Sequence, residues 1–466
     1  MYCSEACRKR AKRAIAKIHE TATGTTAATK SGQARSYSVE TASPAGQRGE
    51  GNGSEAKADT PGGRTRDGRF ERRDRHQGVS RGKTFKGCGR KLIAGAAALT
   101  GGPDGGGWAG VATCGMVHMC AWCAARILAV RAEYAQGGTE AHVAAGGGIV
   151  FTTHTLRHYR RMRYGTLRKG ERGGLVATLH DAWTTSYGHR TGKQWLAVKE
   201  RAGVLGYLRV FEDTWGDDTG HHLHFHVAWF TKRPLSAAEI EVFGDELRAR
   251  WARSVEAAGG YRVSTSCDRP GCACGGKGHG VVVDQVDLST AGAVGKYLFK
   301  DGDHAGVADL DGIGAELAFG NVKSGWRAGR LGPFELGDLA ATGEAEAVEA
   351  WQEREYGVYG VRKMFITAGL RKHLATLGVT EDRTDAEIAA DEGRGRVPIA
   401  LFPRDTWYQH ILPVRGRRLD LIHAAETGDA WRVRGLVESW GLVWGRDVLD
   451  PPPPVEGTAD NAQMED

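Results

Sequence analysis

Residues 207–230 read YLRVFEDTWGDDTGHHLHFHVAWF, and this stretch carries the strongest structural signal in the chain. Two runs rich in aromatic and β-branched residues, 207–215 and 221–230, flank the segment Gly-Asp-Asp-Thr-Gly. Aromatic and β-branched residues favour strands, while Gly and Asp favour tight turns. The stretch therefore predicts a β-hairpin.

The second run of this hairpin alternates between histidine and apolar residues. His222, His224 and His226 would share one face of the strand, because side chains two apart point the same way. Neutral imidazoles bind Mn²⁺, Co²⁺, Ni²⁺ or Zn²⁺, and they tolerate Mg²⁺ when phosphate oxygens complete its coordination shell. The alternative is a set of half-buried histidines without a ligand, but three on one face favour a metal site.

The hairpin also offers a carboxylate to this face. If the turn centres on Asp218, Glu212 is the direct cross-strand neighbour of His224. A register shift of one residue would instead turn Glu212 to the opposite face, where it would be a surface glutamate. We interpret Glu212 as a further metal ligand.

A helix is expected at residues 290–301, and it carries Tyr297 and Lys300 on one face, three residues apart. A phenol has a pKa of about 10, so it becomes a useful nucleophile only beside a stabilising charge or a base. Lys300, or Lys296 just before the tyrosine, could supply that charge. Alone, Tyr-x-x-Lys is a weak pattern, and it gains weight from following the histidine strand.

The nine cysteines cluster at short spacings, which favours metal sites over disulfides in a cytoplasmic protein. Cys88, Cys114, Cys120 and Cys123 could form a four-thiolate zinc site, with His118 as a substitute ligand. A second group occupies a Gly-rich loop and is equally consistent with zinc and with a plain loop; it comprises Cys267, Cys272, Cys274 and His279. Cys3 and Cys7 form only half a site, and we assign no metal to them.

These motifs together resemble the HUH endonuclease superfamily. HLHFHVAWF (222–230) is similar to its His-hydrophobic-His strand, KYLFK (296–300) to its Tyr-x-x-Lys helix, and FTTHTLRH (151–158) to its opening strand. More closely, the chain resembles the rolling-circle replication initiators of actinobacterial plasmids over roughly residues 85 to 400. Those proteins start with a cysteine-rich segment, here 114–127, and often carry a Gly-Arg-x-x-Pro-Phe stretch, here 329–336.

The resemblance implies that His224 and His226 bind a catalytic Mg²⁺ or Mn²⁺ and that Tyr297 is the nucleophile. His222 matches a further histidine often found in this group. The implied reaction nicks and rejoins DNA, leaving a free 3′-OH and a 5′-phosphotyrosyl link. The implied partners are plasmid origin DNA with a single-stranded nick site, a host helicase and a host polymerase. The histidine strand precedes the tyrosine, as in replication initiators and unlike conjugative relaxases.

The fold class implied is α+β: an HUH nuclease domain of ferredoxin-like type, in which helices flank an antiparallel sheet. We place this domain at 148–335, after a zinc-ribbon-like segment at 85–147 and before a helical C-terminal region at 336–450. Composition further predicts a basic, cysteine-containing helix at 1–22, a disordered linker at 23–84 and a disordered tail at 451–466.

Composition excludes some classes of protein. No run of 18 apolar residues and no apolar signal region occur, so we expect a cytoplasmic protein. The net charge of +7 alone does not identify a nucleic-acid binder. Residues 64–86, however, carry nine Lys or Arg against three acidic residues, which suits either phosphate binding or a solvated linker.

Two other functions remain open. A transposase of the rolling-circle type also combines zinc, HUH and tyrosine motifs, although many use two tyrosines on the helix. A non-catalytic, zinc-containing DNA-binding regulator is the alternative outside the superfamily, but such a module has no need for an open face of histidines.

Overall fold

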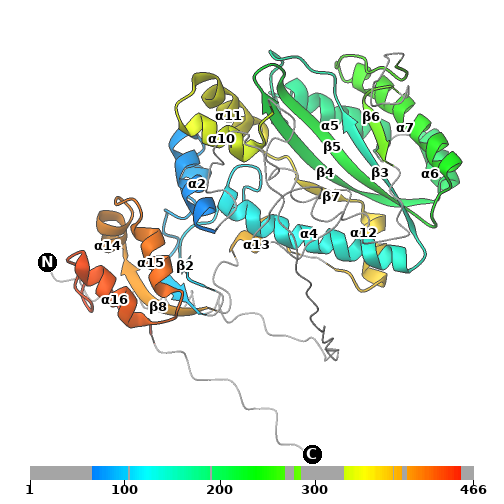
Figure 1. Cartoon of the computed structure of the whole chain (residues 1–466). Helices are drawn as coiled ribbons and strands as arrows, with labels where there is room; N and C mark the ends of the chain where they lie inside the picture. Colours follow the sequence, from blue (N-terminus) through cyan, green and yellow to red (C-terminus); the bar gives the residue numbers. More distant parts are fainter. Residues whose placement is uncertain are drawn as a thin grey trace, which may run out of the picture. The chain divides into compact units, whose positions relative to one another are not determined.

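The computed structural model describes residues 66–102, 105–188, 192–267, 278–284, 330–380, 383–390 and 396–452. The described residues form two compact units (Figure 1). The larger unit comprises the described residues between Gly62 and Lys91 and between Ala112 and Asp391. The smaller unit comprises Leu92–Val111 together with those that follow Glu392.

A five-stranded antiparallel sheet is the centre of the larger unit, with the strand order β6-β3-β5-β4-β7. Its strands are β3 (Gly148–Thr155), β4 (Val204–Gly216), β5 (Gly220–Thr231), β6 (Val281–Asp284) and β7 (Met364–Ile366). The predicted hairpin is confirmed as β4 and β5, the longest strands of the sheet.

Helices cover both faces of this sheet (Figure 1). The face of Phe225 and Trp229 packs against α5 (Gly174–Tyr187), α6 (Gly192–Arg201) and α7 (Ala237–Ala257) in an aromatic core. On the other face, Ala228 and Phe230 lie in a separate apolar cluster with residues of α4 (Ala121–Ala144) and α12 (Ala368–Thr376). The predicted α+β class, with an antiparallel sheet and flanking helices, is confirmed.

Two helices begin with capping boxes. Ser236 and Glu239 form one at the start of α7. Thr384 and Glu387 form a second one at the start of α13 (Asp385–Ala390). Capping boxes satisfy backbone N–H groups that the first turn of a helix leaves free.

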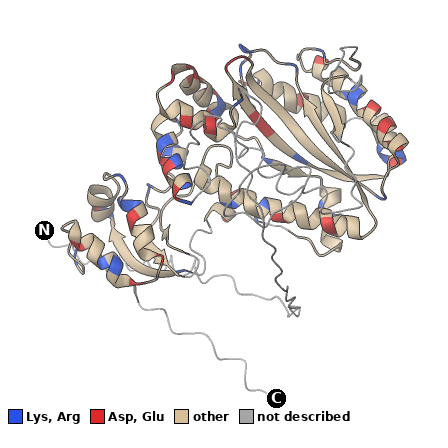
Figure 2. Cartoon of the chain, in the orientation of Figure 1, with Lys and Arg blue, Asp and Glu red and all other residues tan. Residues whose placement is uncertain are grey.

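The disordered linker predicted for 23–84 is wrong at its C-terminal end. Residues 66–86 form α2 (Arg66–Val79) and α3 (Lys83–Lys86). Basic residues outnumber acidic ones on α2, and Figure 2 shows both kinds along the helix. It is nevertheless part of the core, because Asp338 of α10 (Pro333–Ala341) binds Arg72, Arg75 and His76. Part of the basic charge is therefore neutralised within the protein.

The C-terminal region is divided between the two units. α10 and α11 (Ala345–Gly357), together with β7, α12 and α13, belong to the larger unit. The smaller unit contains a three-stranded antiparallel sheet, in the order β2-β1-β8, which the sequence did not predict. These strands are β1 (Ala96–Gly101), β2 (Gly107–Ala109) and β8 (Val397–Pro403).

Short helices complete the smaller unit. They are α14 (Arg404–Thr406), the π-helical turn η1 (Trp407–Ile411), α15 (Arg417–Ala425) and α16 (Ala430–Ser439). The rings of Trp108, Phe402 and Trp407 form the centre of its core. The segment predicted as a single zinc-binding unit at 85–147 is thus interrupted, because β1 and β2 belong to the smaller unit.

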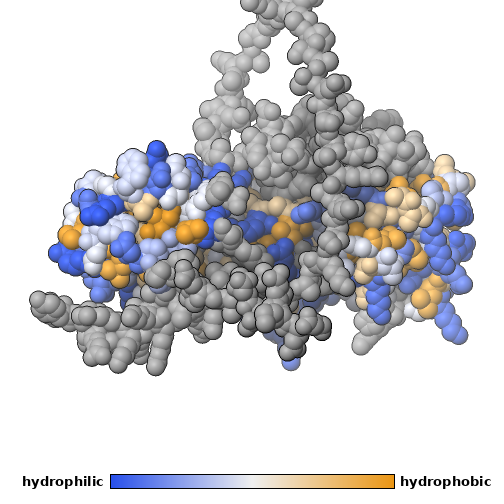
Figure 3. Space-filling view, turned by 90° about the horizontal axis from the view of Figure 1, so that it is seen from below, coloured by the Kyte–Doolittle hydropathy of each residue, from blue (hydrophilic) through white to orange (hydrophobic). Residues whose placement is uncertain are grey.

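None of the described helices is long and apolar enough to cross a membrane. On the surface seen in Figure 3, apolar side chains are interspersed with hydrophilic ones. Scattered apolar side chains are normal on protein surfaces.

Candidate metal centres

The register of the β4–β5 hairpin agrees with the prediction. Glu212 lies opposite His224, and Gly216 lies opposite Gly220 at the tip. Gly220 has a φ of 69°, and a Cβ there would lie 2.4 Å from the carbonyl oxygen of Arg160. Glycine is therefore required for the hairpin to turn beside residue 160.

Glu212, His224 and His226 come together on one face of the sheet. The Nε2 atoms of His224 and His226 lie 3.0 and 2.7 Å from Oε2 of Glu212, and 3.1 Å from each other. Ligands about 2.1 Å from a cation in an octahedral shell are separated by about 3 Å. The three atoms thus have the spacing of neighbouring ligands, and they are one of two such groups among the described residues.

The surroundings orient His226 toward this group. Its Nδ1 lies 3.1 Å from Oγ1 of Thr153, and its ring stacks on Phe151. If Nδ1–H donates to the Thr153 hydroxyl, the Nε2 lone pair is left free for a cation. Hydrogen bonds of this kind fix the tautomer and the ring orientation of metal-binding histidines.

The group also has protonation states that suit metal binding. Burial would raise the pKa of Glu212, but the charges and hydrogen bonds of His224 and His226 outweigh it and hold that pKa well below its ordinary value. Burial lowers the pKa of His224, and Glu212 opposes this effect. A carboxylate that stays ionised and an imidazole that gives up its proton easily are the forms that bind cations.

His222 lies next to the group but is not one of its three members. Its Nδ1 lies 3.3 Å from Nδ1 of His158, a neighbour that the sequence analysis did not single out. Burial, followed by the charges of His224 and His158, lowers the pKa of His222 to about 2. His222 is therefore neutral, and its ring stands 5.1 Å from that of His224.

The stretch 329–336 is the one that resembles the Gly-Arg-x-x-Pro-Phe motif. The structure describes it from residue 330 onward, and this part lies beside the hairpin. Leu331 pairs with Trp215 of β4 through two backbone hydrogen bonds of 2.9 and 2.7 Å. Burial is the main cause that lowers the pKa of both His222 and His158, and the charge of Arg330 contributes in the same direction. Nothing in the spacing of the motifs predicts that this stretch lies near the histidines.

A buried ion pair fixes the opposite side of β4. The guanidinium of Arg354 on α11 donates to both carboxylate oxygens of Asp213, the residue after Glu212. Tyr164 donates to the same carboxylate at 3.2 Å, and Arg354 also donates to the carbonyl oxygen of His118 at 2.8 Å. This network ties the hairpin to α11 and to the cysteine-bearing loop.

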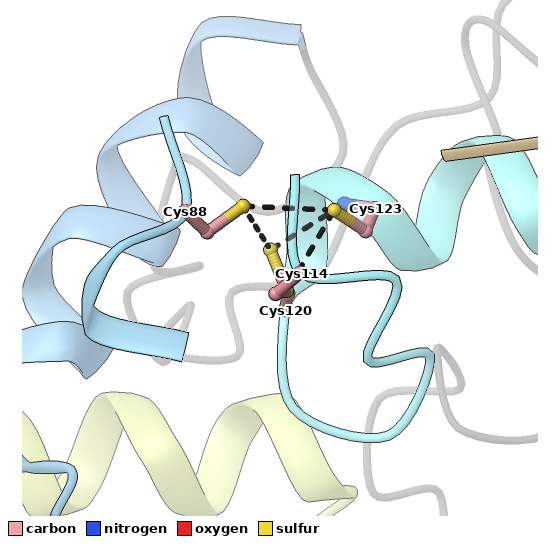
Figure 4. A group of neighbouring side chains, drawn as sticks. All are labelled: Cys88, Cys114, Cys120 and Cys123. Atoms are coloured by element: carbon pink, nitrogen blue, oxygen red, sulfur yellow. Dashed lines mark hydrogen bonds between the residues drawn. The ribbon is translucent and has the colours of Figure 1, made fainter. Parts of the chain in front are cut away.

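Four cysteines form the second group (Figure 4). Cys88 follows α3, Cys114 lies in a loop, Cys120 is the N-cap of α4, and Cys123 lies in its first turn. Three of the Sγ–Sγ distances are 3.6, 3.7 and 3.8 Å. A tetrahedral zinc with Zn–S bonds of about 2.3 Å separates its sulfurs by about 3.8 Å. The four thiols therefore fit zinc, whereas a disulfide would need about 2 Å.

Other predicted site residues lie elsewhere. His118, the substitute zinc ligand, has its Nε2 3.1 Å from the carbonyl oxygen of Val361 and is not a member of the cysteine group. Cys267 is half-buried and His279 is exposed. The remaining predicted residues lie outside the described part of the chain: Tyr297, Lys300, Cys272, Cys274, Cys3 and Cys7.

Comparison with known proteins finds one curated relative. The chain is 28% identical over 369 residues to the protein named "Protein rep" of Streptomyces lividans. The match covers 69% of this chain and 76% of that protein. No family model and no solved structure matches the chain.

Proposed function

We propose that this protein initiates rolling-circle replication of a plasmid by nicking and rejoining origin DNA. The observation that carries the proposal is the group of Glu212, His224 and His226, whose ligand atoms lie within 4.8 Å of one another. The similarity to a protein named rep supports a Rep-type replication protein. The Tyr-x-x-Lys motif downstream of the histidine strand supports a tyrosine nucleophile.

In this proposal, Glu212, His224 and His226 hold a Mg²⁺ or Mn²⁺ ion, and His222 stands beside them as a further candidate ligand. A cation held by these residues would polarise the scissile phosphate and offset the charge that develops during transfer. Burial and the contact between His226 and Thr153 keep the side chains oriented before substrate arrives, which removes a reorganisation step.

Tyr297 is the proposed nucleophile. Its phenol oxygen loses its proton and forms a bond to phosphorus, the bond from phosphorus to the 3′-oxygen breaks, and one proton is taken up by that oxygen, which leaves as a 3′-OH, so that protons balance over the step. Lys300 would contact the phosphate. The 5′-phosphotyrosyl link conserves the bond energy, so rejoining needs no ATP. The 3′-OH would prime a host polymerase while a host helicase separates the strands.

We further propose that the thiols of Cys88, Cys114, Cys120 and Cys123 hold a structural zinc. Such a site stabilises the fold and does not contact substrate. For the group of Cys267, Cys272, Cys274 and His279, zinc and a plain loop remain alternatives.

A nicking assay on candidate origin DNA tests the function. The His224→Ala/His226→Ala variant should lose cleavage with Mg²⁺ or Mn²⁺ while it retains most of its duplex binding. His410→Ala, at an exposed position of the smaller unit, is the matched control and should cleave like the wild type. Undiminished nicking by the double variant would contradict the metal assignment. A wild type that binds the origin but never cleaves it would favour the regulator.

A further inference from the structure

Residues 157–172, here called the basic arm, follow β3 directly. We propose that the basic arm and the tyrosines beside it bind single-stranded DNA and lead it to the metal centre. This inference rests on the proposed function, because it names the surface that delivers the substrate. It adds a binding surface to a site that the motifs define only by its metal ligands and its nucleophile.

The composition of the basic arm suits a phosphate backbone. It carries seven Lys or Arg residues and one acidic residue, Glu171. Arg160 and Arg172 form ion pairs with Glu346 and Asp181. The exposed side chains of Arg157, Arg161 and Lys169 have no carboxylate partner among the described residues. Exposed cations without carboxylate partners are available to neutralise phosphates and release their counterions.

The basic arm begins at the proposed metal centre. Thr155, at the end of β3, is paired with His224. Three residues later, His158 contacts His222. The arm then passes the tip of the β4–β5 hairpin, where Gly220 approaches the carbonyl of residue 160. A strand bound along the arm would therefore run from the metal ligands past the hairpin tip.

Aromatic rings lie at the start of the arm. Tyr159 and Tyr261 are 44% and 51% exposed, and their rings meet edge to face with centroids 5.0 Å apart. The guanidinium of Arg157 lies 5.5 Å from the Tyr159 ring, and residue 157 bridges Tyr261 through the backbone. Proteins that bind single strands combine such exposed rings, on which unpaired bases stack, with nearby cations. Paired bases cannot stack in this way, so the rings favour a single strand over a duplex.

A groove continues from the arm. Its volume is about 1460 Å³, and its lining includes Arg161, Arg163 and Arg168 of the arm and also Arg81 and Lys83. Pockets for small ligands typically measure about 300–1,000 Å³, so this groove has room for a polymer segment.

Acidic residues also line the groove, but most of them have partners. Glu346 and Glu353 pair with Arg160 and Arg163, and Glu355 accepts from the backbone N–H groups of residues 81 and 82. Asp217 and Glu349 complete the acidic lining. The carboxylates of Glu346 and Glu353 add little repulsion toward phosphate, because arginine charges of the arm offset theirs.

The test measures binding of a labelled 20-nucleotide oligothymidylate by fluorescence anisotropy, with EDTA present to prevent cleavage. Each phosphate contact contributes about 0.7 to the slope of log K against log salt for single strands. Arg157→Ala/Arg161→Ala/Lys169→Ala should therefore reduce the slope by about 2 and weaken binding about a hundredfold at 0.1 M salt.

The control variant removes the same charge elsewhere on the larger unit, at three exposed helix positions. It is Lys193→Ala/Arg371→Ala/Lys372→Ala, and its slope and affinity should match the wild type. Equal losses in the arm variant and the control would mean that only net charge matters, and the proposal would fall. Circular dichroism of each variant verifies that it is folded.

Stacking is tested separately. Tyr159→Ala should weaken binding about tenfold and abolish the quenching of a 2-aminopurine base placed in the oligonucleotide, while Tyr159→Phe keeps the ring and should retain both. Unchanged binding and quenching in Tyr159→Ala would overturn the stacking role.

Nicking by the wild type is measured in parallel with Mn²⁺. If the wild type nicks DNA but the arm variant binds the oligonucleotide normally, the arm proposal fails and the proposed function stands. If the arm variant loses binding but the wild type never nicks DNA, the arm proposal stands and the proposed function fails.

Discussion

Tyr297 is the residue on which the proposed chemistry depends most directly. Tyr297→Phe removes one oxygen and almost no volume, so folding and DNA affinity should survive while cleavage disappears. Lys300→Ala should slow cleavage without abolishing it, because the lysine assists and forms no bond. The measurement is mass-spectrometric peptide mapping of the protein–DNA adduct. A nucleotide on Tyr261 or Tyr207 instead, or strong cleavage by the Phe variant, would identify another nucleophile.

Asp338 makes a pH-dependent contribution to stability. Burial would raise the pKa of this carboxyl, but His76 and Arg72 outweigh burial and lower it to about 2. The folded state thus prefers the ionised form, and the resulting stability is present above the ordinary pKa near 3.8 and is lost as the pH falls toward 2. We expect Asp338→Asn to reduce the free energy of unfolding by about 1–3 kcal/mol at pH 7.

The difference in unfolding free energy between Asp338→Asn and the wild type should shrink below pH 4, where this carboxyl begins to take up a proton in the unfolded chain while it is still ionised in the folded protein. Urea unfolding at pH 7 and pH 3 measures it. Asp181→Asn is the control, because its pair with Arg172 is exposed and contributes about 0–1 kcal/mol. A penalty for Asp338→Asn that stays constant with pH would contradict the assigned ion pairs.

Among single residues, those of the hairpin could be placed from the sequence, because their positions depend only on the turn and on the alternation along each strand, which are both local. The turn residues fix the register, and the two-residue period of a strand then fixes the face of Glu212 and of His224. His158 could not be placed in the same way. It approaches His222 only because β3 pairs with β5, and it is 64 residues away along the chain.

At the scale of elements, the first turn of α4 supplies two of the four thiols. Cys120 caps the helix, and Cys123 lies one turn later, so both sulfurs point to the same end. We expect purified protein to contain at least one tightly held zinc per chain. The Cys120→Ser/Cys123→Ser variant should lose that zinc and unfold at a lower temperature.

Elemental analysis together with thermal unfolding measures both effects. His410→Ala is a suitable control, since His410 is exposed and lies outside the four-thiol group. Folded wild-type protein without zinc would refute the assignment.

Helix α2 illustrates why some elements escape prediction from sequence. Its apolar content is low, and its buried residues include Arg73, His76 and Gln77. Burial of His76 is possible because Asp338, 262 residues away along the chain, lies beside it in the fold. The local composition of α2 resembles that of a disordered linker. Only its contact with α10 distinguishes this helix from a linker.

At the scale of the whole molecule, the smaller unit interrupts the larger one. The chain leaves the larger unit after Lys91 and returns at Ala112, and these two residues are joined by a backbone hydrogen bond of 2.7 Å. Glu212, His224, His226 and the four-cysteine group all belong to the larger unit. The larger unit thus contains both proposed metal sites.

We therefore expect a variant that ends at residue 390, with 92–111 replaced by a short Gly-Ser linker, to fold and to retain zinc. Its ends are already adjacent, so closing the gap requires little loop entropy. Zinc content and a cooperative thermal transition are the measurements. A variant that keeps 92–111 but lacks the C-terminal residues is the comparison, and it should aggregate more, because all six residues of β1 are buried in the full chain. Failure of the first variant to fold would show that the larger unit depends on the smaller one.

The pairing of β1 with β8 has a consequence for protein synthesis. Ala97 and Phe402 are neighbours in the sheet, but β8 leaves the ribosome only after more than half of the chain has followed β1. Domains generally fold as units during translation, so the larger unit can form while β1 still lacks its partner. An unpaired apolar strand edge invites association with other chains. For most of translation, the nascent chain carries such an edge, and binding of β1 by a chaperone until β8 emerges would protect it.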